Sequence, residues 1–583
     1  MFDTRIKSAT IIDGSGGVPF TADIGITDGV IAEIGESIGE AKKTIDADGA
    51  TATPGFVDIH THFDGQISWD ETLAPSILHG VTTCVMGNCG VGFAPLKKND
   101  EQRLISLMEG VEDIPGSVLA EGIDFSWETF PEYMDAIDAI PHSIDFAVQV
   151  PHDALRLYVM GDRAENLEPA NADDIVAMKL IVRESLAAGA AGFSTGRTDI
   201  HLTAKGQWTP SSEATRDELV GISSVFADSN HGCIQVVSDF NLFRSEDDFD
   251  REFDLIDAMA EAGGGRPLSM TWLQRVPGEH QWRAIEKRVS QAAERGLDIK
   301  LQTAARGIGV ITGLDTSFHP FTGVPGYKEI SALPLEARAA RMRDPEVRKR
   351  ILSEKSEPLA GDGSPVPPFV DQMLAQIDVL AGRMFPMEEE VDYEPPPEKS
   401  FLAQAQQKGC RPLEAIYDYL VAGHGSQLIY FPVFNYAGGT LDVVYEMLNH
   451  PRALVSLSDS GAHVGTICDA SFQTTMLTHW CRDRQGPRLE LPKVVQMLSA
   501  RNADYMGFTD RGRIAVGQKA DINIIDLDNL HLPPPKIVRD LPGGGRRLLQ
   551  GANGYIATLV AGEVVIADGV VTDARPGRLL RAA

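Results

Sequence analysis

The segment GFVDIHTHFDG, residues 55–65, carries two histidines one residue apart within a run that otherwise predicts a β-strand. Side chains alternate sides along a strand, which predicts one polar face and one mostly apolar face here. The polar face would carry Asp58, His60, His62 and Asp64. Two imidazoles on one face can bind one metal ion at about 2.0–2.1 Å, with carboxylates available to orient them. The segment therefore predicts a metal site, with an ordinary polar strand face as the alternative.

A parallel sheet would position such a site, and the middle of the chain has the pattern of one. It alternates short apolar runs with helical stretches, which is typical of βα units. The predicted strands, in order, are FVDIHTH, TTCVMGNCG, IDFAVQVPH, AAGFSTG, CIQVVSDF, PLSMTWLQ, DIKLQTAA and ALVSLSD. Eight such units predict an α/β fold, a (β/α)8 TIM barrel, whose active site lies at the C-terminal ends of the strands. Residues at or near those ends are His60, His62, Cys89, Ser238, Trp272 and Asp459.

The chain of 583 residues is long enough for one large domain with insertions or for two to three domains. Both ends are rich in short strand-like runs separated by Asp-Gly turns. We therefore expect residues 1–54 and 506–583 to form one small β-sandwich, ending in a loose tail. The barrel would occupy residues 55–505, with insertions at about 93–143 and 308–451. Long insertions over a barrel mouth commonly form lids or substrate pockets.

Composition restricts the partners. Lys and Arg total 52 against 83 Asp and Glu, a net charge of -31. Such a surface repels polyphosphates and anionic lipids, so we expect neither nucleic acid nor a membrane as partner. The N-terminus lacks the pattern of a secretory leader, no run of 18 apolar residues occurs, and the six cysteines have no repeated spacing. These features predict a cytoplasmic protein, and a homo-oligomer is left open.

Five segments occur in this order along the chain: PGFVDIHTHFD, MGNCGVGFAPL, AAGFSTG, SLSDSGAH and SARNADYMGFTDRGRIAVGQKADINIID. Together they resemble the amidohydrolase superfamily, in particular its D-aminoacylase, or N-acyl-D-amino-acid deacylase, group. The resemblance spans nearly the whole chain and implies a metal-dependent hydrolase built from a barrel and a small β-sandwich of both termini. It further implies that His60 and His62 bind metal and that Cys89 replaces the carboxylated lysine of other amidohydrolases. Asp459 would be both ligand and proton shuttle.

The sequence departs from that group at two positions. Relatives place a histidine at the ends of strands five and six, where this chain has Ser238 and Trp272. Neither residue is a good zinc ligand, so we expect one zinc ion rather than two, with another divalent metal as the alternative. Asp239, His152 or His201 could supply a replacement ligand, although a core or loop hydrogen bond is the simpler role for each.

The predicted function is hydrolysis of the amide bond of an N-acyl (D-)amino acid or a related small acyl amide by a metal-activated water. Asp459 would accept the proton of that water and deliver it to the departing amine. Arg197 could pair with a substrate carboxylate, with a structural salt bridge as the alternative. His201 and His463 are the other candidate substrate contacts. Two alternatives stay open: the same scaffold acting on an ester, lactone or cyclic amide, and a non-catalytic relative that binds a ligand.

Overall fold

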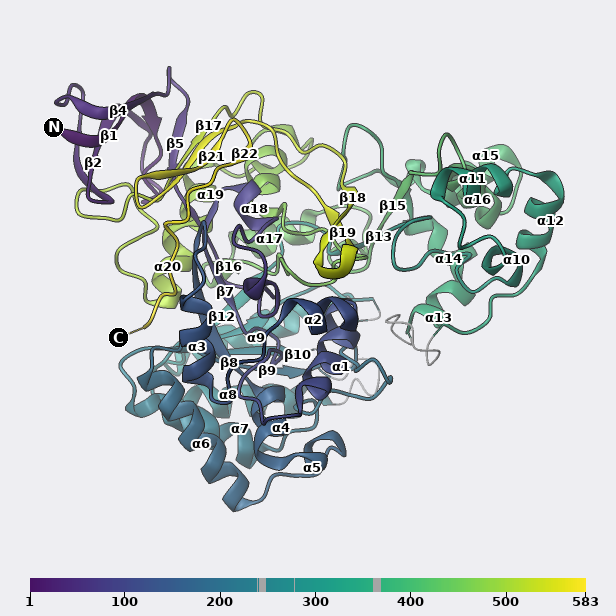
Figure 1. Cartoon of the computed structure of the whole chain (residues 1–583), viewed down its shortest axis with the longest axis horizontal. Helices are drawn as coiled ribbons and strands as arrows, with labels where there is room; N and C mark the ends of the chain where they lie inside the picture. Colours follow the sequence, from purple (N-terminus) through teal and green to yellow (C-terminus); the bar gives the residue numbers. More distant parts are fainter. Residues whose placement is uncertain (239, 241–247, 277, 360–368, 583) are drawn as a thin grey trace.

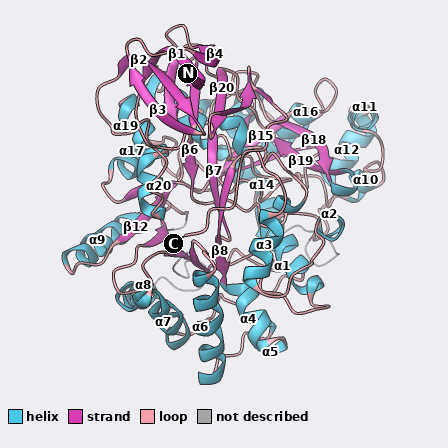
Figure 2. Cartoon of the chain, turned by 60° about the vertical axis from the view of Figure 1, so that its left-hand side comes forward, coloured by secondary structure: helices cyan, strands magenta, loops and turns pink. Residues whose placement is uncertain are grey.

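A computed structural model describes residues 1–238, 240, 248–276, 278–359 and 369–582. Its central feature is a sheet of eight parallel strands in the order β16-β12-β11-β10-β9-β8-β7-β6. Figure 2 labels β6, β7, β8 and β12 of this sheet. The strands are β6 (Phe56–Asp58), β7 (Val81–Met86), β8 (Asp145–Pro151), β9 (Gly192–Arg197), β10 (Cys233–Ser238), β11 (Leu268–Thr271), β12 (Ile299–Thr303) and β16 (Ala453–Val455). Each corresponds to one predicted strand, which confirms the α/β class and the parallel sheet.

The two outer strands of this sheet approach each other. Just beyond β6, the His62 N–H donates to the Ser460 carbonyl, which follows β16, over 2.7 Å. Nearer the start of the strands, the Asn502 amide donates to the carbonyls of Val57 and Val455 over 2.8 and 2.9 Å. The sheet therefore curls back on itself, and the C-terminal ends of its strands meet at a common mouth.

Apolar side chains from β6, β7, β8, β10 and β16, or from residues beside the strands, meet inside the sheet. This inner cluster contains Val57, Ile59, Val85, Ala147, Ala191, Cys233 and Leu454, joined by Ala503, Tyr505 and Met506 of α20 (Ala500–Met506). The simple alternation predicted for residues 57–64 is therefore wrong. Ile59 packs inside the sheet, and His60, its neighbour, also reaches the interior, because β6 ends at Asp58 and the chain no longer follows a regular strand there.

Helices that follow the strands cover the outside of the sheet (Figure 1). They include α1 (Glu101–Glu112), α2 (Gly116–Gly122), α3 (Phe130–Asp138), α4 (His152–Met160), α6 (Ala172–Ala187), α7 (Arg216–Ser223), α8 (Phe249–Ala262), α9 (Gln281–Glu294), α17 (Asp442–Asn449) and α19 (Leu491–Leu498). The largest hydrophobic cluster of the protein lies between these helices and the sheet. Among the described residues, no helix has both the length and the apolar character needed to cross a membrane.

Both ends of the chain contribute strands to a second, nine-stranded sheet. Its strands are β1 (Phe2–Ile11), β2 (Phe20–Thr27), β3 (Val30–Gly35), β4 (Ala41–Asp46), β5 (Thr51–Pro54), β17 (Ile522–Ile525), β20 (Tyr555–Val560), β21 (Glu563–Ala567) and β22 (Val570–Val571). Strand β5 pairs antiparallel with β17, with Ala52 opposite Ile524. The prediction of a loose tail is wrong. The Phe146 N–H donates to the Arg578 carbonyl over 3.1 Å, and the Leu580 N–H donates to the Phe146 carbonyl over 2.7 Å.

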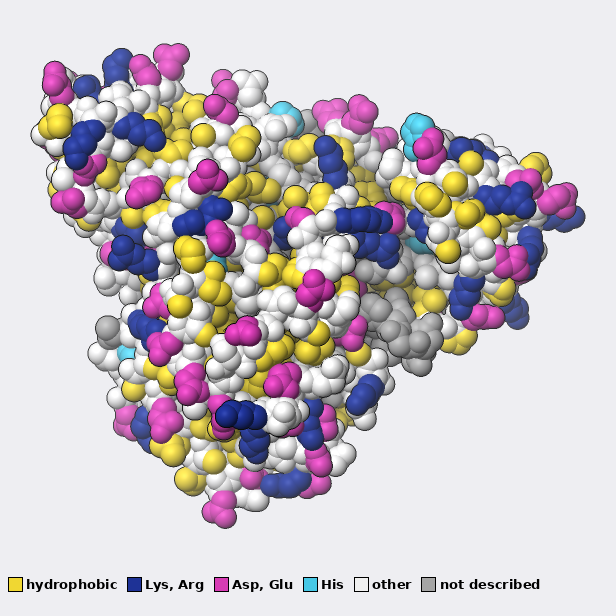
Figure 3. Space-filling model, in the orientation of Figure 1, with side chains coloured by type: hydrophobic (Ala, Val, Ile, Leu, Met, Phe, Trp, Pro, Cys, Tyr) yellow, Lys and Arg dark blue, Asp and Glu magenta, His cyan; other side chains and the backbone are white. Residues whose placement is uncertain are grey.

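The long connection between β12 and β16 forms a helical lobe that stands beside the body of the molecule (Figures 1 and 3). Its helices are α10 (Pro325–Lys328), α11 (Leu335–Met342), α12 (Pro345–Ser353), α13 (Phe369–Ala375), α14 (Ile377–Leu380), α15 (Phe401–Lys408) and α16 (Pro412–Leu420). They enclose a hydrophobic core of their own. A small sheet of β13 (Gly309–Gly313), β14 (Phe385–Pro386) and β15 (Leu428–Pro432) joins the lobe to the body.

A hairpin near the C-terminus contacts both the mouth of the parallel sheet and this lobe. It consists of β18 (Lys536–Leu541) and β19 (Gly545–Leu549). The Leu548 N–H donates to the Val464 carbonyl over 2.7 Å, close to the end of β16. Arg546 pairs with Asp315 in the lobe connection, with nitrogen and oxygen 3.2 Å apart. The hairpin therefore fixes the loop after β16 against the second insertion.

Candidate metal centre

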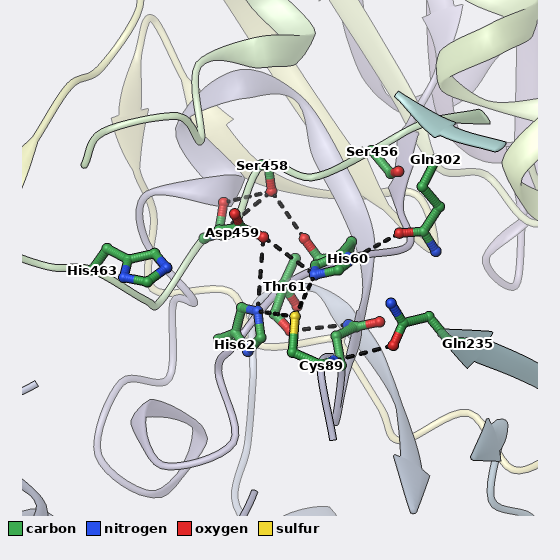
Figure 4. A network of polar contacts seen from close by, with 12 residues as sticks. His60, Thr61, His62, Cys89, Gln235, Gln302, Ser456, Ser458, Asp459 and His463 are labelled. Atoms are coloured by element: carbon green, nitrogen blue, oxygen red, sulfur yellow. Dashed lines mark hydrogen bonds and ion pairs between the residues drawn. The ribbon is translucent and has the colours of Figure 1, made fainter. Parts of the chain in front are cut away.

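Three side chains from two strand ends converge at the mouth of the sheet (Figure 4). His60 Nε2 lies 3.2 Å from Cys89 Sγ, and His62 Nε2 lies 3.6 Å from the same sulfur. In the part of the chain that the structure describes, this is the one group of three metal-ligating side chains with donor atoms within 4.8 Å of one another. All three side chains are buried. The structure thus brings together the two histidines and the cysteine that the resemblance implies.

Asp459 completes this arrangement on the solvent side. Its Oδ1 lies 3.3 Å from His60 Nε2 and 3.7 Å from His62 Nε2, and its side chain is 17% exposed while the two rings are 1% exposed. It lines a surface pocket together with Gly461, Asp469 and Arg547. Burial raises the pKa of Asp459 to about 7. The carboxylate therefore stands between the buried donors and the opening.

At three positions of the site the backbone adopts the left-handed conformation, which residues other than glycine rarely take. The φ angles of Cys89, Asp459 and His463 are +57°, +45° and +48°. Non-glycine residues in this left-handed region cluster at functional sites, because the surrounding structure must hold them there. Gly87 enables the turn before Cys89, since a Cβ on Gly87 would lie 2.2 Å from the Gln149 carbonyl oxygen. The G-N-C-G motif thus sets the direction of the cysteine side chain.

A polar side chain faces the second ring nitrogen of each histidine. His60 Nδ1 lies 2.6 Å from Gln302 Oε1 on β12, and His62 Nδ1 lies 3.3 Å from Glu112 Oε1 at the end of α1. An oxygen at Nδ1 favours the tautomer with its proton on that nitrogen, which leaves the Nε2 lone pair for a metal. Burial is the main cause that lowers the pKa of His60 to about 4 and that of His62 well below its usual value. Both rings are therefore neutral and available as ligands.

The carboxylates predicted to orient the rings do not do so. Asp58 accepts hydrogen bonds from the Ser458 hydroxyl, the Gln473 amide and the His60 backbone N–H, at 2.5, 2.9 and 3.2 Å. Asp64 is buried, and its Oδ2 has no hydrogen-bond partner among the described residues. The reason is the irregular backbone after β6, which separates these carboxylates from the imidazoles they flank in sequence.

The interior of the site is acidic. Burial is the main cause that raises the pKa of Asp64 to about 7 and that of Glu112 well above its usual value, and Asp459 and Asp64 add repulsion at Glu112. Both oxygens of Glu112 and the Oδ1 of Asp459 lack a hydrogen-bond partner in the described structure. Buried carboxylates without partners are stabilised by a cation, and imidazole, thiolate and carboxylate together suit a divalent ion such as zinc. The residues present therefore fit a metal.

Two of the predicted substrate contacts lie beside this centre. His463 Nε2 is 3.6 Å from Glu112 Oε2, and its side chain is 23% exposed. His201 Nδ1 is buried without a hydrogen-bond partner in the described structure, and the charge of His201 adds to the low pKa of His62 and of His463. Both rings therefore border the mouth.

Arg197 is engaged elsewhere. Its Nε and a terminal nitrogen bond to the two oxygens of Glu252 at 2.6 and 3.0 Å, and its other terminal nitrogen donates to the Ala214 carbonyl over 2.9 Å. This is the structural salt bridge named above as the alternative. The edge formed by Nε and that terminal nitrogen, which would match a substrate carboxylate, is therefore already paired with Glu252.

The two departures from the family pattern point away from the interior. Ser238 Oγ lies 3.4 Å from Glu252 Oε1 of α8. Trp272 Nε1 donates to the Trp282 carbonyl of α9 over 2.8 Å. Both side chains therefore face the helical layer, and neither could bind a metal at the mouth.

Of the candidate replacement ligands, His152 lies in the core of the protein and is bonded there. His152 bonds through Nδ1 to Thr195 Oγ1 at 2.8 Å and through Nε2 to Glu218 Oε1 at 3.0 Å, so it is a core hydrogen-bonding residue. Asp239 lies outside the described residues.

Comparison with known proteins agrees with this geometry. The chain matches the family model described as the amidohydrolase family over residues 43–357 and 425–566. The protein therefore belongs to the amidohydrolase family, as the sequence predicted. Within that family it is similar to the D-aminoacylase-like group, which confirms the second part of the resemblance. The D-aminoacylase of Alcaligenes xylosoxydans xylosoxydans is 33% identical over 222 residues. That alignment spans 38% of this chain and 41% of the relative.

Solved structures of the same group share the fold. A D-aminoacylase structure described by its binuclear metal centre has a TM-score of 0.63 at 22% identity, with full coverage of both chains. An N-acyl-D-glutamate deacylase from Bordetella bronchiseptica, complexed with zinc and a phosphonate inhibitor, has a TM-score of 0.64 at 24% identity, again with full coverage. These likenesses support the architecture around the mouth.

Proposed function

We propose that the protein is a metal-dependent amidohydrolase that cleaves the amide bond of an N-acyl (D-)amino acid or a related small acyl amide. The observation that carries this proposal is the convergence of His60, His62 and Cys89 beside Asp459 at the mouth of the sheet. The similarity to a D-aminoacylase and to an N-acyl-D-glutamate deacylase supports the substrate class.

We further propose zinc as the metal, with one ion rather than two. His60, His62, Cys89 and Asp459 would hold it, and the single ligand group of the described residues supports that number. The zinc of the deacylase structure supports the identity of the ion, although the D-aminoacylase structure carries a binuclear centre. A divalent ion held there would polarise the scissile carbonyl and make an attacking water more acidic.

The residues of this chain would supply proton transfer and positioning. A carboxylate oxygen of Asp459 would take the proton of the attacking water and return it to the departing amine nitrogen, since this side chain alone of the donor set is open to solvent. The rings of His201 and His463 would contact the substrate at the mouth. Leu548 and Arg547 of the C-terminal hairpin border the same pocket and would exclude bulk water.

The architecture proposed with this function is a closed (β/α)8 TIM barrel over residues 55–505 and a β-sandwich of residues 1–54 and 506–583. The curl of the parallel sheet and the pairing of β5 with β17 support it.

The test combines metal analysis with a substrate panel. Purified protein should contain about one zinc per chain and should release amine from N-acyl-D-amino acids faster than it hydrolyses esters, lactones or cyclic amides of similar size. Faster turnover of a cyclic amide or ester would favour the alternative substrate classes. Metal-loaded protein that turns over none of them, yet binds an N-acyl-amino acid, would contradict the enzymatic proposal.

A further inference from the structure

Glu112 occupies an unfavourable position for a carboxylate. It is the last residue of α1, and Asp113, which follows it, takes a left-handed conformation with φ +52°. The C-terminal end of a helix carries partial negative charge, which disfavours an acid there. The Glu112 side chain is also 1% exposed, and neither oxygen has a hydrogen-bond partner by distance and angle in the described structure. The helix dipole and burial therefore both disfavour an ionised carboxylate at this position.

The contacts of Glu112 are with two histidines of the mouth. Oε1 lies 3.3 Å from His62 Nδ1, and Oε2 lies 3.6 Å from His463 Nε2. The His463 N–H also donates to the Glu112 backbone carbonyl. One residue of the first insertion thus contacts the end of β6 through its side chain and the loop after β16 through both side chain and backbone.

The end of α1 is held firmly enough to fix this geometry. A Cβ on Gly110 would lie 2.2 Å from the Ala204 backbone nitrogen, so the helix packs directly against the neighbouring backbone. The Ala204 N–H donates to the Ser106 carbonyl of the same helix over 3.0 Å. This close packing places the Glu112 carboxylate next to the ring of His62.

We propose that Glu112 is a positioning residue of the metal centre, which holds the proton of His62 on Nδ1 and so presents the Nε2 lone pair toward Cys89 and Asp459. This inference rests on the proposed function, because it assigns Glu112 a role only if a metal binds there. An ionised carboxylate can only accept this proton, whereas the Gln302 amide that faces His60 can accept or donate by turning over. A cation at the donor set would favour the ionised form of Glu112 against the burial that raises its pKa, and the contact at His62 Nδ1 then fixes one tautomer.

The test compares zinc binding by wild type, Glu112→Gln, Glu112→Ala and a matched control, Glu109→Gln. Glu109 lies one turn earlier on α1, where its Oε1 accepts the Gly116 N–H over 2.9 Å. Zinc affinity is measured by competition with a chelator, and the metal-free melting temperature is measured in parallel. Loss of such an outer partner typically weakens metal affinity about 10–100-fold. We expect a loss of that size for both Glu112 variants, with Gln at the lower end, and wild-type affinity for Glu109→Gln.

The outcomes separate this inference from the proposed function. Wild type that binds neither zinc nor another divalent metal ion would refute the metal-dependent hydrolase itself. Wild type that binds zinc, with both Glu112 variants within about threefold of it, would refute the positioning role alone, since the expected loss is about 10–100-fold. If the metal-free melting temperature falls for the Glu112 variants but not for the Glu109→Gln control, the residue is structural and the inference is overturned. Weaker zinc binding at an unchanged melting temperature supports it.

Discussion

Replacing Asp459 with asparagine separates the contribution of this residue to proton transfer from its contribution to folding. Asparagine keeps the size of the side chain and one oxygen ligand, but it cannot carry a proton in the manner of a carboxylate. It also tolerates the left-handed backbone at this position, where φ is +45°, because Asn and Asp both adopt that region. Oδ1 of Asp459 has no hydrogen-bond partner to lose in the described structure. The fold should therefore be retained.

The expected effect on turnover follows from this placement. General acid-base groups typically contribute about 10²–10⁴-fold, and each tenfold step corresponds to about 1.36 kcal/mol of activation free energy. Asp459→Asn should thus lower kcat by that factor, or by about 2.7–5.4 kcal/mol. The zinc content should remain close to that of wild type, since His60, His62 and Cys89 are unchanged.

The assay measures kcat on an N-acyl-D-amino acid, zinc per chain and the melting temperature for each variant. Asp568→Asn is the matched control, because Asp568 is an exposed aspartate with φ +49° in the turn between β21 and β22. It should behave as wild type. An Asp459→Asn enzyme with near-normal kcat and full zinc content would refute the assigned proton path, although not the fold.

Three further outcomes are expected. His60→Ala should lose zinc and activity together, and full zinc occupancy in that variant would remove His60 from the ligand set. Deletion of residues 510–583 should give insoluble protein because it leaves β5 without β17, so a soluble, active truncation would contradict that pairing. Burial alone would raise the pKa of Glu394, but hydrogen bonds from His479 and Arg484 outweigh it and lower the pKa to about 2. That group contributes stability above the unfolded pKa near 4.5, and the contribution is lost as pH falls toward 2. The unfolding midpoint of wild type should therefore fall more steeply between pH 5 and 3 than that of Glu394→Gln, and equal slopes would refute the linkage.

The strands of the parallel sheet could be predicted because each is a short apolar run between turn signals. The candidate ligands could be predicted because His60, His62, Cys89 and Asp459 lie in short motifs at strand ends, where a local pattern decides the position. Their roles remain predictions. Gln302 left a weak signal, as the last of three polar residues that alternate with Ile299 and Leu301 in the run DIKLQ.

Side-chain contacts across long separations could not be predicted where no motif marks the residues. Glu112 lies 50 residues after His62, inside an insertion whose path no local pattern reveals, and its one signal is an acidic residue at the end of an amphipathic helix. Arg197 and Glu252 form their salt bridge across 55 residues. Ser238 and Trp272 were assigned to the mouth from their position along the strand, whereas the direction of a side chain depends on where the alternation of each strand begins.

The pairing of β5 with β17 also has a consequence for how the protein is made. Strand β5 ends at Pro54, and β17 begins only at Ile522. At typical rates of synthesis of about 5–20 residues per second, roughly 25–90 s pass between the appearance of the two strands on the ribosome. Throughout that time β5 presents an unpaired edge that other chains can join. Nascent chains can therefore pair with one another through this edge, so crowded expression should lower the yield of active protein more than the stability of the finished fold suggests.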